Sequence, residues 1–369
     1  MIKMRFCCYK DQRFLTLAIL CLVLCTLSGC AVVGPSSISK GRATYNEAIN
    51  ITADEQILLA IVKGCYGETI SLLAVSSVAA NVGFRVNAGA EVGIGSQENY
   101  AGNLVPFSGG VAYEENPTIS YVPVQGENYL HQLLSPIPLR TLLLFMRSTP
   151  DKAEYSIVLV DRINDMQNPA FLDSPFAKTD LLFQSFVELH SELVKAGVIH
   201  WVENPKKEDT FNLLITNYAP AYSEKVREYI RLLGLPMPTD QSEDIVLPVN
   251  LAIKGREVDG VAISTRSTFD LIEILRAAVE IPQEQVSAGL AYKYPPPGLA
   301  GKDLHIYASK DKPVQPAVAV KHRGYWFYID DADMTTKLYF KLVRTMWSVA
   351  ISSVADQRAA PVLTIPVSR

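Results

Sequence analysis

The stretch VAANVGFRVNAGAEVGIG, residues 78–95, alternates apolar and polar positions. Every even position from 78 to 94 is apolar, and most odd positions carry a polar residue or glycine. Alternation with a period of two is typical of a β-strand that has one apolar face. A second alternating run, 105–121, follows after the polar residues 96–103. The two runs together predict a long antiparallel hairpin.

The first residues of the chain have the order of a secretory signal peptide. Four basic residues, the last of them Arg13, precede an apolar run of 13 residues, 15–27. Such a run is too short to span a bilayer comfortably and has the length of a signal-peptide core. Residues 1–29 are therefore expected to be a signal peptide.

The signal peptide ends in a specific motif. Leu27-Ser28-Gly29-Cys30 resembles a bacterial lipobox. The resemblance implies that Cys30 is the first residue of the mature chain and carries a diacylglycerol and an acyl chain. Ala31 stands where Asp commonly retains such lipoproteins in the inner membrane, which implies the outer membrane, facing the periplasm. The alternative is an ordinary secretory signal with a chance cysteine.

The charge balance restricts the partners of the mature protein. The chain has 34 Lys and Arg against 38 Asp and Glu, and residues 1–29 contain four of the former and one of the latter. The remaining 30 basic and 37 acidic residues argue against a nucleic-acid partner and against peripheral attraction to anionic lipid. We therefore expect contact with the membrane through the lipid on Cys30.

The cysteine count excludes a disulfide framework. Of the six cysteines, four lie in residues 1–29 and one is Cys30. Only Cys65 remains as a thiol, so an intramolecular disulfide and a cysteine-rich zinc site are both excluded. A single Cys in a helical apolar stripe is usually buried packing.

The order of the remaining segments predicts an α+β fold. It combines a lipid-anchored N-terminus, a long N-terminal β-hairpin, and domains that mix helices with antiparallel sheets. Pro- and Gly-containing polar stretches suggest where the parts meet. The expected parts are a signal peptide at 1–29, a lipidated tether at 30–42, a helix plus hairpin at 43–125, an α+β domain at 126–236 and a C-terminal α+β domain at 245–369.

Several helix ends carry a local signature. Residues 52–55, TADE, have the pattern of a capping box, and residues 267–270, STFD, are expected to cap a helix that continues to Ala278. Gly197 and Gly234 stand where helices over 178–196 and 223–233 are expected to end. The near-continuous apolar run at 155–160 predicts a strand.

Three segments carry a wider resemblance. They are YNEAI with EQILLAIVKG at 45–64, NPTISYVPVQG at 116–126 and HRGYWFYIDDADMTTKLYFKLVRT at 322–345. In these segments the chain resembles an uncharacterised group of Gram-negative lipoproteins that has no assigned activity. The resemblance implies a location for the protein and no function.

Motifs for catalysis are missing from the sequence. The five histidines are scattered, and neither GxSxG nor a Walker A motif occurs. Asp330, Asp331 and Asp333 form one acidic cluster that could bind a divalent cation. The more common role of such residues at a strand end before a helix is to cap that helix. We therefore expect neither a metal site nor enzymatic activity.

Two classes of function remain. The first is a non-enzymatic binding or assembly module, held to the outer membrane by its lipid and working with a protein partner or with further copies of itself. The second is an oligomeric outer-membrane pore or translocation component to which each protomer donates the hairpin 78–121. The face that would meet lipid or another protomer consists of Val82, Phe84, Val86, Val92 and Ile94.

Overall fold

The structure is a computed structural model, and it confirms the α+β class. The chain forms two compact units, residues 1–55 and 56–369. The residues that the structure describes are 43–69, 72–90, 107–124, 126–148, 158–175, 180–204, 210–216, 220–236, 244–252, 260–355 and 363–366.

Residues 43–65 are helical, and this helix begins earlier than the sequence predicts. The Thr52 hydroxyl donates to the carbonyl of Ala48, one turn back, at 2.9 Å. The prediction of a capping box at 52–55 is therefore wrong, because these residues lie inside the helix and not at its start. In the second unit, Leu58, Ile61 and Cys65 are completely buried, as their helical spacing predicts.

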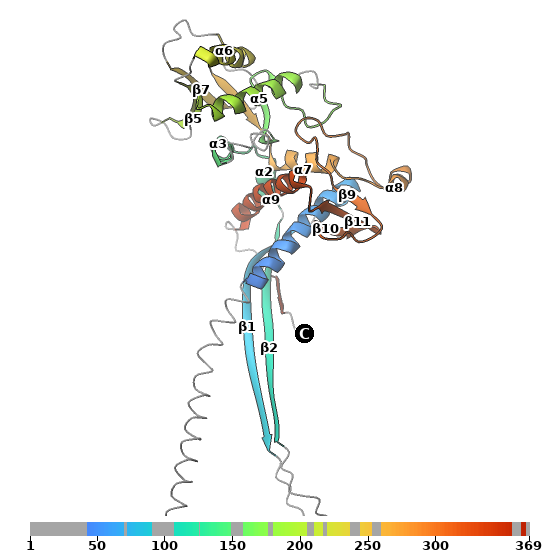
Figure 1. Cartoon of the computed structure of the whole chain (residues 1–369). Coiled ribbons are helices and arrows are strands. Elements are labelled where there is room, and N and C mark those ends of the chain that lie inside the picture. Colours follow the sequence, from blue (N-terminus) through green and yellow to red (C-terminus); the bar gives the residue numbers. More distant parts are fainter. Residues whose placement is uncertain are drawn as a thin grey trace, which may run out of the picture. The chain divides into compact units, whose positions relative to one another are not determined.

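The hairpin is present and consists of β1, Leu72–Ala90, and β2, Phe107–Val124 (Figure 1). The two strands pair antiparallel from Leu72 opposite Val124 to Ala90 opposite Phe107. β1 begins six residues before the predicted start at Val78, because the apolar segment LLAV extends the strand at its beginning. The predicted turn at 96–103 lies outside the described residues.

The largest sheet has six strands in the order β4-β3-β8-β7-β6-β5. All neighbours pair antiparallel except β7 and β8, which are parallel. Its strands are β3 Val160–Ile163, β4 Met166–Gln167, β5 Ile199–Glu203, β6 Phe211–Ile215, β7 Ile245–Leu251 and β8 Val261–Thr265.

This sheet joins parts of the chain that we expected to be separate. β6 lies before residues 237–243 and β7 after them, yet the two strands pair along five residues. The boundary expected between 126–236 and 245–369 therefore runs through one hydrogen-bonded sheet. The strand expected at 155–160 also differs, since residues 158 and 159 form a helical turn and the strand begins at Val160.

Two helices accompany this sheet and end as predicted. Helix α5, Asp180–Lys195, contacts β4, β5 and helix α6, Ser223–Leu232. Gly197 and Gly234 follow them with φ angles of 70° and 69°. These left-handed angles suit glycine, which has no Cβ to clash.

A second sheet and three helices, α7, α8 and α9, lie in the C-terminal third of the chain. The sheet has the order β10-β11-β9, and Arg323 and Gly324, both with positive φ, turn the chain between β10 and β11. Helix α9 contacts α2, α7, β11 and β2. The bounds are α2 Glu127–Leu134, α3 Leu139–Ser148, the 3-10 helix η2 Pro220–Tyr222, α7 Thr268–Ala277, α8 Gln283–Ser287, β9 Tyr307–Ser309, β10 Pro316–His322, β11 Tyr325–Asp330, α9 Met334–Ala355 and β12 Leu363–Pro366.

Candidate functional site

The β1–β2 ladder has one apolar face, because the two alternating runs pair in matching register. Phe84 lies opposite Tyr113, Val86 opposite Val111, and Ala90 opposite Phe107. Directly opposed residues of an antiparallel pair share a face. The even positions of β1 and the odd positions of β2 therefore lie on one face, and the polar positions of both strands lie on the other.

A single irregularity keeps this face continuous toward the base of the hairpin. Val75 pairs with Tyr121 and Val78 with Ile119, so the register shifts by one residue between Val75 and Ser77. Such a bulge moves the following residues to the other face. It brings Leu73 and Val75, at odd positions, onto the same face as the even positions that follow.

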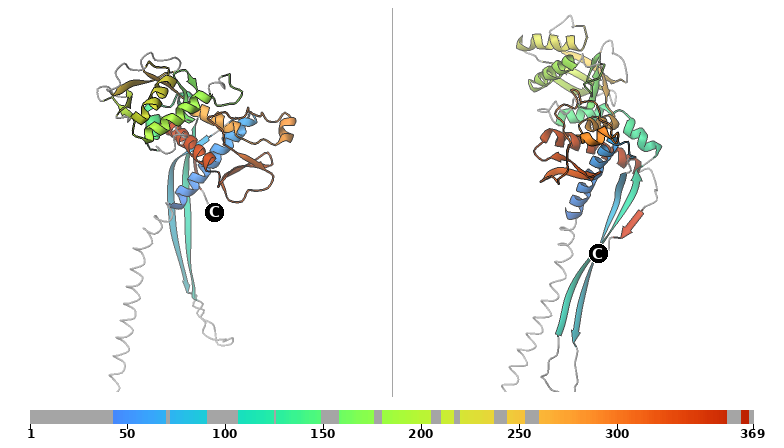
Figure 2. Two further views of the ribbon diagram at one scale, coloured as in Figure 1. Left: turned by 45° about the horizontal axis from the view of Figure 1, so that its top comes forward. Right: turned by 90° about the vertical axis from the view of Figure 1, so that its right-hand side faces the viewer.

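The last strand of the chain extends this ladder at its base. β12 pairs antiparallel with β2, with Leu363 opposite Tyr121 and Ile365 opposite Ile119 (Figure 2). These two apolar residues join the apolar face, which therefore covers three strands in the order β1-β2-β12. The sequence had predicted no strand here, because a run of four residues has too little periodicity to identify.

The predicted face residues fall partly within this ladder. Val82, Phe84 and Val86 are in β1 on the apolar face. Val92, Ile94 and the predicted lipidation residue Cys30 lie outside the described residues. The structure thus brings together three of the five predicted face residues.

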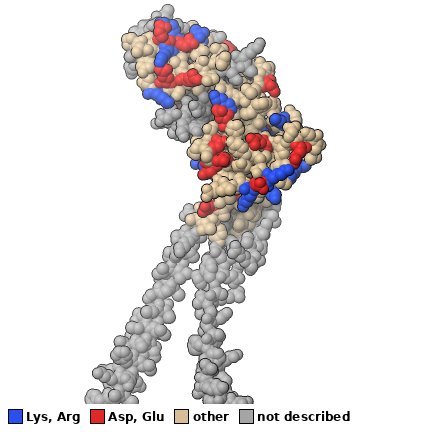
Figure 3. All heavy atoms as spheres, turned by 45° about the vertical axis from the view of Figure 1, so that its right-hand side comes forward, with Lys and Arg blue, Asp and Glu red and all other residues tan. Residues whose placement is uncertain are grey.

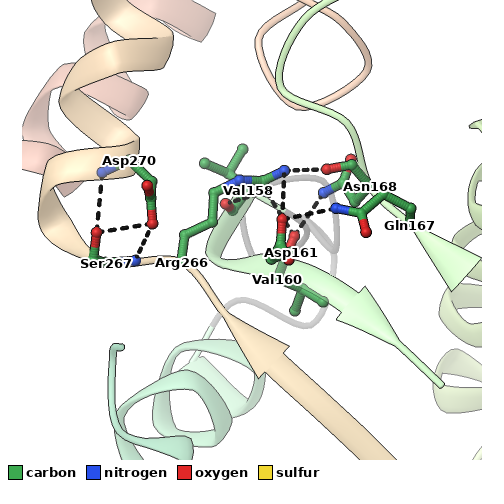
Figure 4. A network of polar contacts seen from close by, with 8 residues as sticks. All are labelled: Val158, Val160, Asp161, Gln167, Asn168, Arg266, Ser267 and Asp270. Carbon is green, nitrogen blue, oxygen red and sulfur yellow. Dashed lines mark hydrogen bonds and ion pairs between the residues drawn. The ribbon is translucent and has the colours of Figure 1, made fainter. Parts of the chain in front are cut away.

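A buried arginine forms the main polar network of the second unit (Figure 4). Nη1 of Arg266 donates to the carbonyls of Val158 and Val160 at 2.9 and 2.6 Å, and Nη2 donates to the carbonyl of Asn168. The carboxylate of Asp161 lies 4.0 Å from the guanidinium. Burial lowers the pKa of Arg266, although an arginine remains charged at any physiological pH.

The residue after Arg266 starts helix α7. The Ser267 side chain accepts from the backbone N–H of Asp270 at 3.1 Å, and the Asp270 carboxylate accepts from the N–H of Ser267 at 2.8 Å. This reciprocal pair is a capping box, and it lies at 267–270, where the sequence predicts a helix cap. Arg266 is thereby held at a fixed junction between a strand and a helix.

A cavity of about 530 Å³ adjoins this network. Its walls include the carboxyl groups of Asp161, Asp270 and Glu273 and the rings of Tyr292 and Tyr294. Burial raises the pKa of Glu273, and Arg276, which forms an ion pair with it, opposes that effect. Asp270 serves the helix cap, while Nε2 of Gln167 donates to Asp161 at 2.9 Å.

The charged groups of the cavity therefore have partners within the protein. Among the residues described around it, each carboxylate has a protein partner and Arg266 is occupied by backbone carbonyls. The arrangement connects β3, β8 and α7. Sequence reasoning missed Arg266, whose one local indication is a charge placed directly between an apolar strand and a helix cap.

The three residues of the acidic cluster before helix α9 have separate partners. Asp333 accepts from the backbone N–H of Thr336 at 3.0 Å, and Asp330 accepts from the N–H of Ala332 at 2.8 Å. Asp331 forms an ion pair with Lys337 at 2.6 Å. Of the three carboxylates, Asp333 is thus the one that caps helix α9. Over the described parts of the chain, no group of three metal-binding side chains occurs.

Two further titratable clusters have partners within the protein. His190 is buried, its Nδ1 lies 2.9 Å from the Tyr229 hydroxyl, and its Nε2 accepts from the Trp201 indole at 3.3 Å. Because Nε2 accepts, Nδ1 carries the proton and the imidazole is neutral. Burial accordingly lowers the pKa of His190 to about 4.

Another such cluster joins the end of the first helix to the turn between β10 and β11. Glu68 accepts from Arg323 at 2.7 Å and lies 3.3 Å from His322. The hydrogen bond from Arg323 lowers the pKa of Glu68. The Arg323 guanidinium lies over the Tyr66 ring, with 5.0 Å between Cζ of Arg323 and the centre of the ring. On the face drawn in Figure 3, basic and acidic side chains are interspersed.

Comparisons with protein-family models, curated proteins and solved structures found no match to this chain. Within the described residues, no helix combines the length and the apolar character needed to cross a membrane.

Proposed function

We propose that the protein is a lipid-anchored, non-enzymatic assembly module of the outer membrane, facing the periplasm. Its working element is the hairpin β1–β2, and the observation that carries the proposal is the single apolar face of this ladder. Phe84 with Tyr113 and Val86 with Val111 place two separate alternating runs on that face. A one-residue slip would have put them on opposite faces.

The length of the ladder supports a role in assembly. β1 has 19 residues and β2 has 18, so the ladder extends about 60 Å at ~3.3 Å per residue. Strands in globular proteins typically have about 5–6 residues. Apolar surface of this extent is stabilised when another surface covers it. Assembly with another chain supplies such a surface.

The state of the charged groups supports a non-enzymatic role. Catalytic groups are usually held in a cavity with shifted pKa values and a free reactive atom. Around the cavity described above, the Arg266 guanidinium binds three backbone carbonyls and Asp270 belongs to the cap of helix α7. Glu273 is paired with Arg276. These groups are arranged to hold the fold together.

The lipid anchor is tested by Cys30→Ser. We expect the variant to leave the membrane fraction while it remains folded, because several acyl chains on one cysteine supply the binding energy. The measurement is membrane fractionation, with circular dichroism as the control for folding. Membrane association that persists without Cys30 would contradict anchoring by the lipid alone and would point to the hairpin.

A second candidate function is favoured by the same matched faces. Each protomer would donate its hairpin to a shared barrel with lipid outside and a polar lumen inside. One hairpin cannot span a bilayer alone, because its open edges would leave backbone groups unpaired in lipid. Glu115 opposite Val82 and Pro117 opposite Ala80 lie on the apolar face, so contact with lipid would begin beyond them.

Two neighbouring substitutions separate the second candidate from the first. Val86→Arg places a charge on the apolar face, whereas Asn87→Arg places it on the polar face of the same strand. If the apolar face meets lipid, Val86→Arg should cost about 2–4 kcal/mol per protomer and Asn87→Arg much less. The measurement is the yield of detergent-extracted oligomer. Equal yields from the two variants would contradict insertion.

A further inference from the structure

The β1–β2 ladder has two outer edges, one along β1 and one along β2, and the two edges differ in how far they are covered. β1 is the end strand of its sheet, with β2 as its single neighbour among the described strands, while β12 covers β2 at 118–121. We propose that a second copy of this chain completes the sheet. Residues 82–90 of β1 in one copy pair antiparallel with residues 109–117 of β2 in the next. This inference rests on the proposed function as an assembly module and names the partner.

Residues 82–90 of β1 have none of the features that protect an exposed edge from pairing. Proteins block such edges with proline, lysine, bulges or very short strands. Residues 82–90 contain neither proline nor lysine, and Arg85 is their one charged residue. The register runs without a shift from Ser77 to Ala90. A long, regular and unprotected edge is suited to pairing with another strand.

The direction of the strands allows copies to join in series. β1 and β2 are antiparallel, so the β2 edge of one copy can pair with the β1 edge of the next and keep the alternation. Because the two edges differ, the contact is heterologous, and it generates a ring when the rotation between copies closes. A closed ring of hairpins leaves no edge unpaired.

The position of β12 sets the extent of the contact. Its four residues occupy β2 from Thr118 to Tyr121, at the base of the hairpin. The open part of β2 is therefore 107–117, which lies opposite 80–90 in its own hairpin. This open segment is long enough for an extended ladder between two copies along 109–117.

The faces and charges of the ladder select the register between copies. An odd offset would put apolar positions of one copy on the polar face of the next, so the offset must be even. Within one hairpin, Arg85 lies opposite Ala112. An offset of two residues places Arg85 of one copy opposite Glu114 of the next, a favourable cross-strand pair. Closing a barrel also requires a stagger of this kind.

Disulfide formation between two differently tagged, full-length, lipidated copies tests this register. One copy carries Asn87→Cys and the other carries Ala112→Cys, positions that the offset places opposite each other across the interface. We expect a cross-linked dimer containing both tags after oxidation in the membrane. Cys65 should stay silent, because it is buried and burial raises the pKa of its thiol to about 12.

Matched pairs control for chance collisions. Asn87→Cys combined with Val111→Cys joins positions on opposite faces and should give a loss of the cross-link. Arg85→Glu should also weaken the cross-link, and Arg85→Glu combined with Glu114→Arg in both copies should restore it. Cross-linking of equal yield in the opposite-face pair would overturn the proposed register.

The outcomes separate this inference from the proposed function. Oligomers in detergent extracts that fail to cross-link at 87 and 112 would overturn pairing between copies. The hairpin would then assemble with a different chain, and the assembly function would stand. A monomer in extracts of the lipidated protein, with the hairpin free of any partner, would overturn both.

Discussion

At the scale of single residues, two buried polar side chains show how the second unit is held together. Arg266 binds three backbone carbonyls through its guanidinium, and His190 lies neutral among aromatic rings. Neither residue lies in a recognisable motif. Each is tolerated inside the protein because it has protein partners for its polar atoms.

His190 should make the stability of the protein depend on pH. Its pKa is about 4 in the folded protein, below the ordinary histidine value of about 6.5, so the unfolded chain binds the proton first. The contribution of neutral His190 to the free energy of unfolding is therefore fully present above about pH 6.5. As the pH falls toward 4, this contribution is lost, which lowers the free energy of unfolding by about 3 kcal/mol. Urea unfolding of the Cys30→Ser form at several pH values measures it.

His190→Phe should remove this part of the pH dependence, and His200→Phe, at an exposed position, should leave it unchanged. The same dependence in both variants would show that His190 is not its source.

Arg266→Met should be far more damaging than loss of a surface arginine. It removes the buried donor that three carbonyls and Asp161 share, at a cost of about 3–5 kcal/mol. Arg140→Met is the control, since the pair with Glu203 is exposed and contributes about 0–1 kcal/mol. Chemical denaturation of the two variants gives both values. Similar losses would contradict a structural role for the network.

At the scale of elements, two predicted helix starts have different outcomes. Residues 267–270 form a capping box at the start of α7, while residues 52–55 lie inside a helix. The motif describes which hydrogen bonds are possible. Whether a helix begins there depends on the residues before it, and at 43–51 the chain is already helical.

Two alanine substitutions test that difference directly. Ser267→Ala should destabilise the protein by about 1 kcal/mol, because the N–H of Asp270 loses its acceptor. Thr52→Ala should be neutral or slightly stabilising, by up to about 0.7 kcal/mol, since alanine is the better helix former. Thermal unfolding of the two variants is the measurement. A larger loss from Thr52→Ala would contradict its position inside the helix.

At the scale of the whole molecule, strands from distant parts of the chain share sheets. β3 pairs with β8 and β6 with β7 across the expected domain boundary, and β12 pairs with β2 across more than half of the chain. The second unit is consequently one folding unit with one core cluster, which runs from Ile57 to Trp347. Its C-terminal strand also covers part of an edge that could otherwise pair.

Removing β12 should therefore increase self-association. Deletion of residues 363–369 uncovers the β2 edge at 118–121, where backbone groups pair with β12 in the intact chain. We expect the truncated Cys30→Ser form to sediment as larger species than the intact Cys30→Ser form. Deletion of 367–369 alone, which keeps β12, is the control. Identical sedimentation of both forms would contradict a protective role for β12.

The sequence by itself determined the properties that depend on neighbouring residues. The alternation at 78–90 and 105–121 defines the apolar faces of both hairpin strands, and the residues at 267–270, Gly197 and Gly234 define three helix ends. These features follow from side-chain period and local hydrogen bonds, which reach no further than about four residues.

Only the tertiary structure decided which strands pair and at what offset. The register that puts Phe84 opposite Tyr113, the parallel pair β7–β8, the position of β12 and the carbonyls that Arg266 binds all join residues distant in the sequence. The alternation in a strand's own sequence determines which of its residues share a face. Which strand pairs with it, and in which register, depends on the free energy of the whole packed sheet.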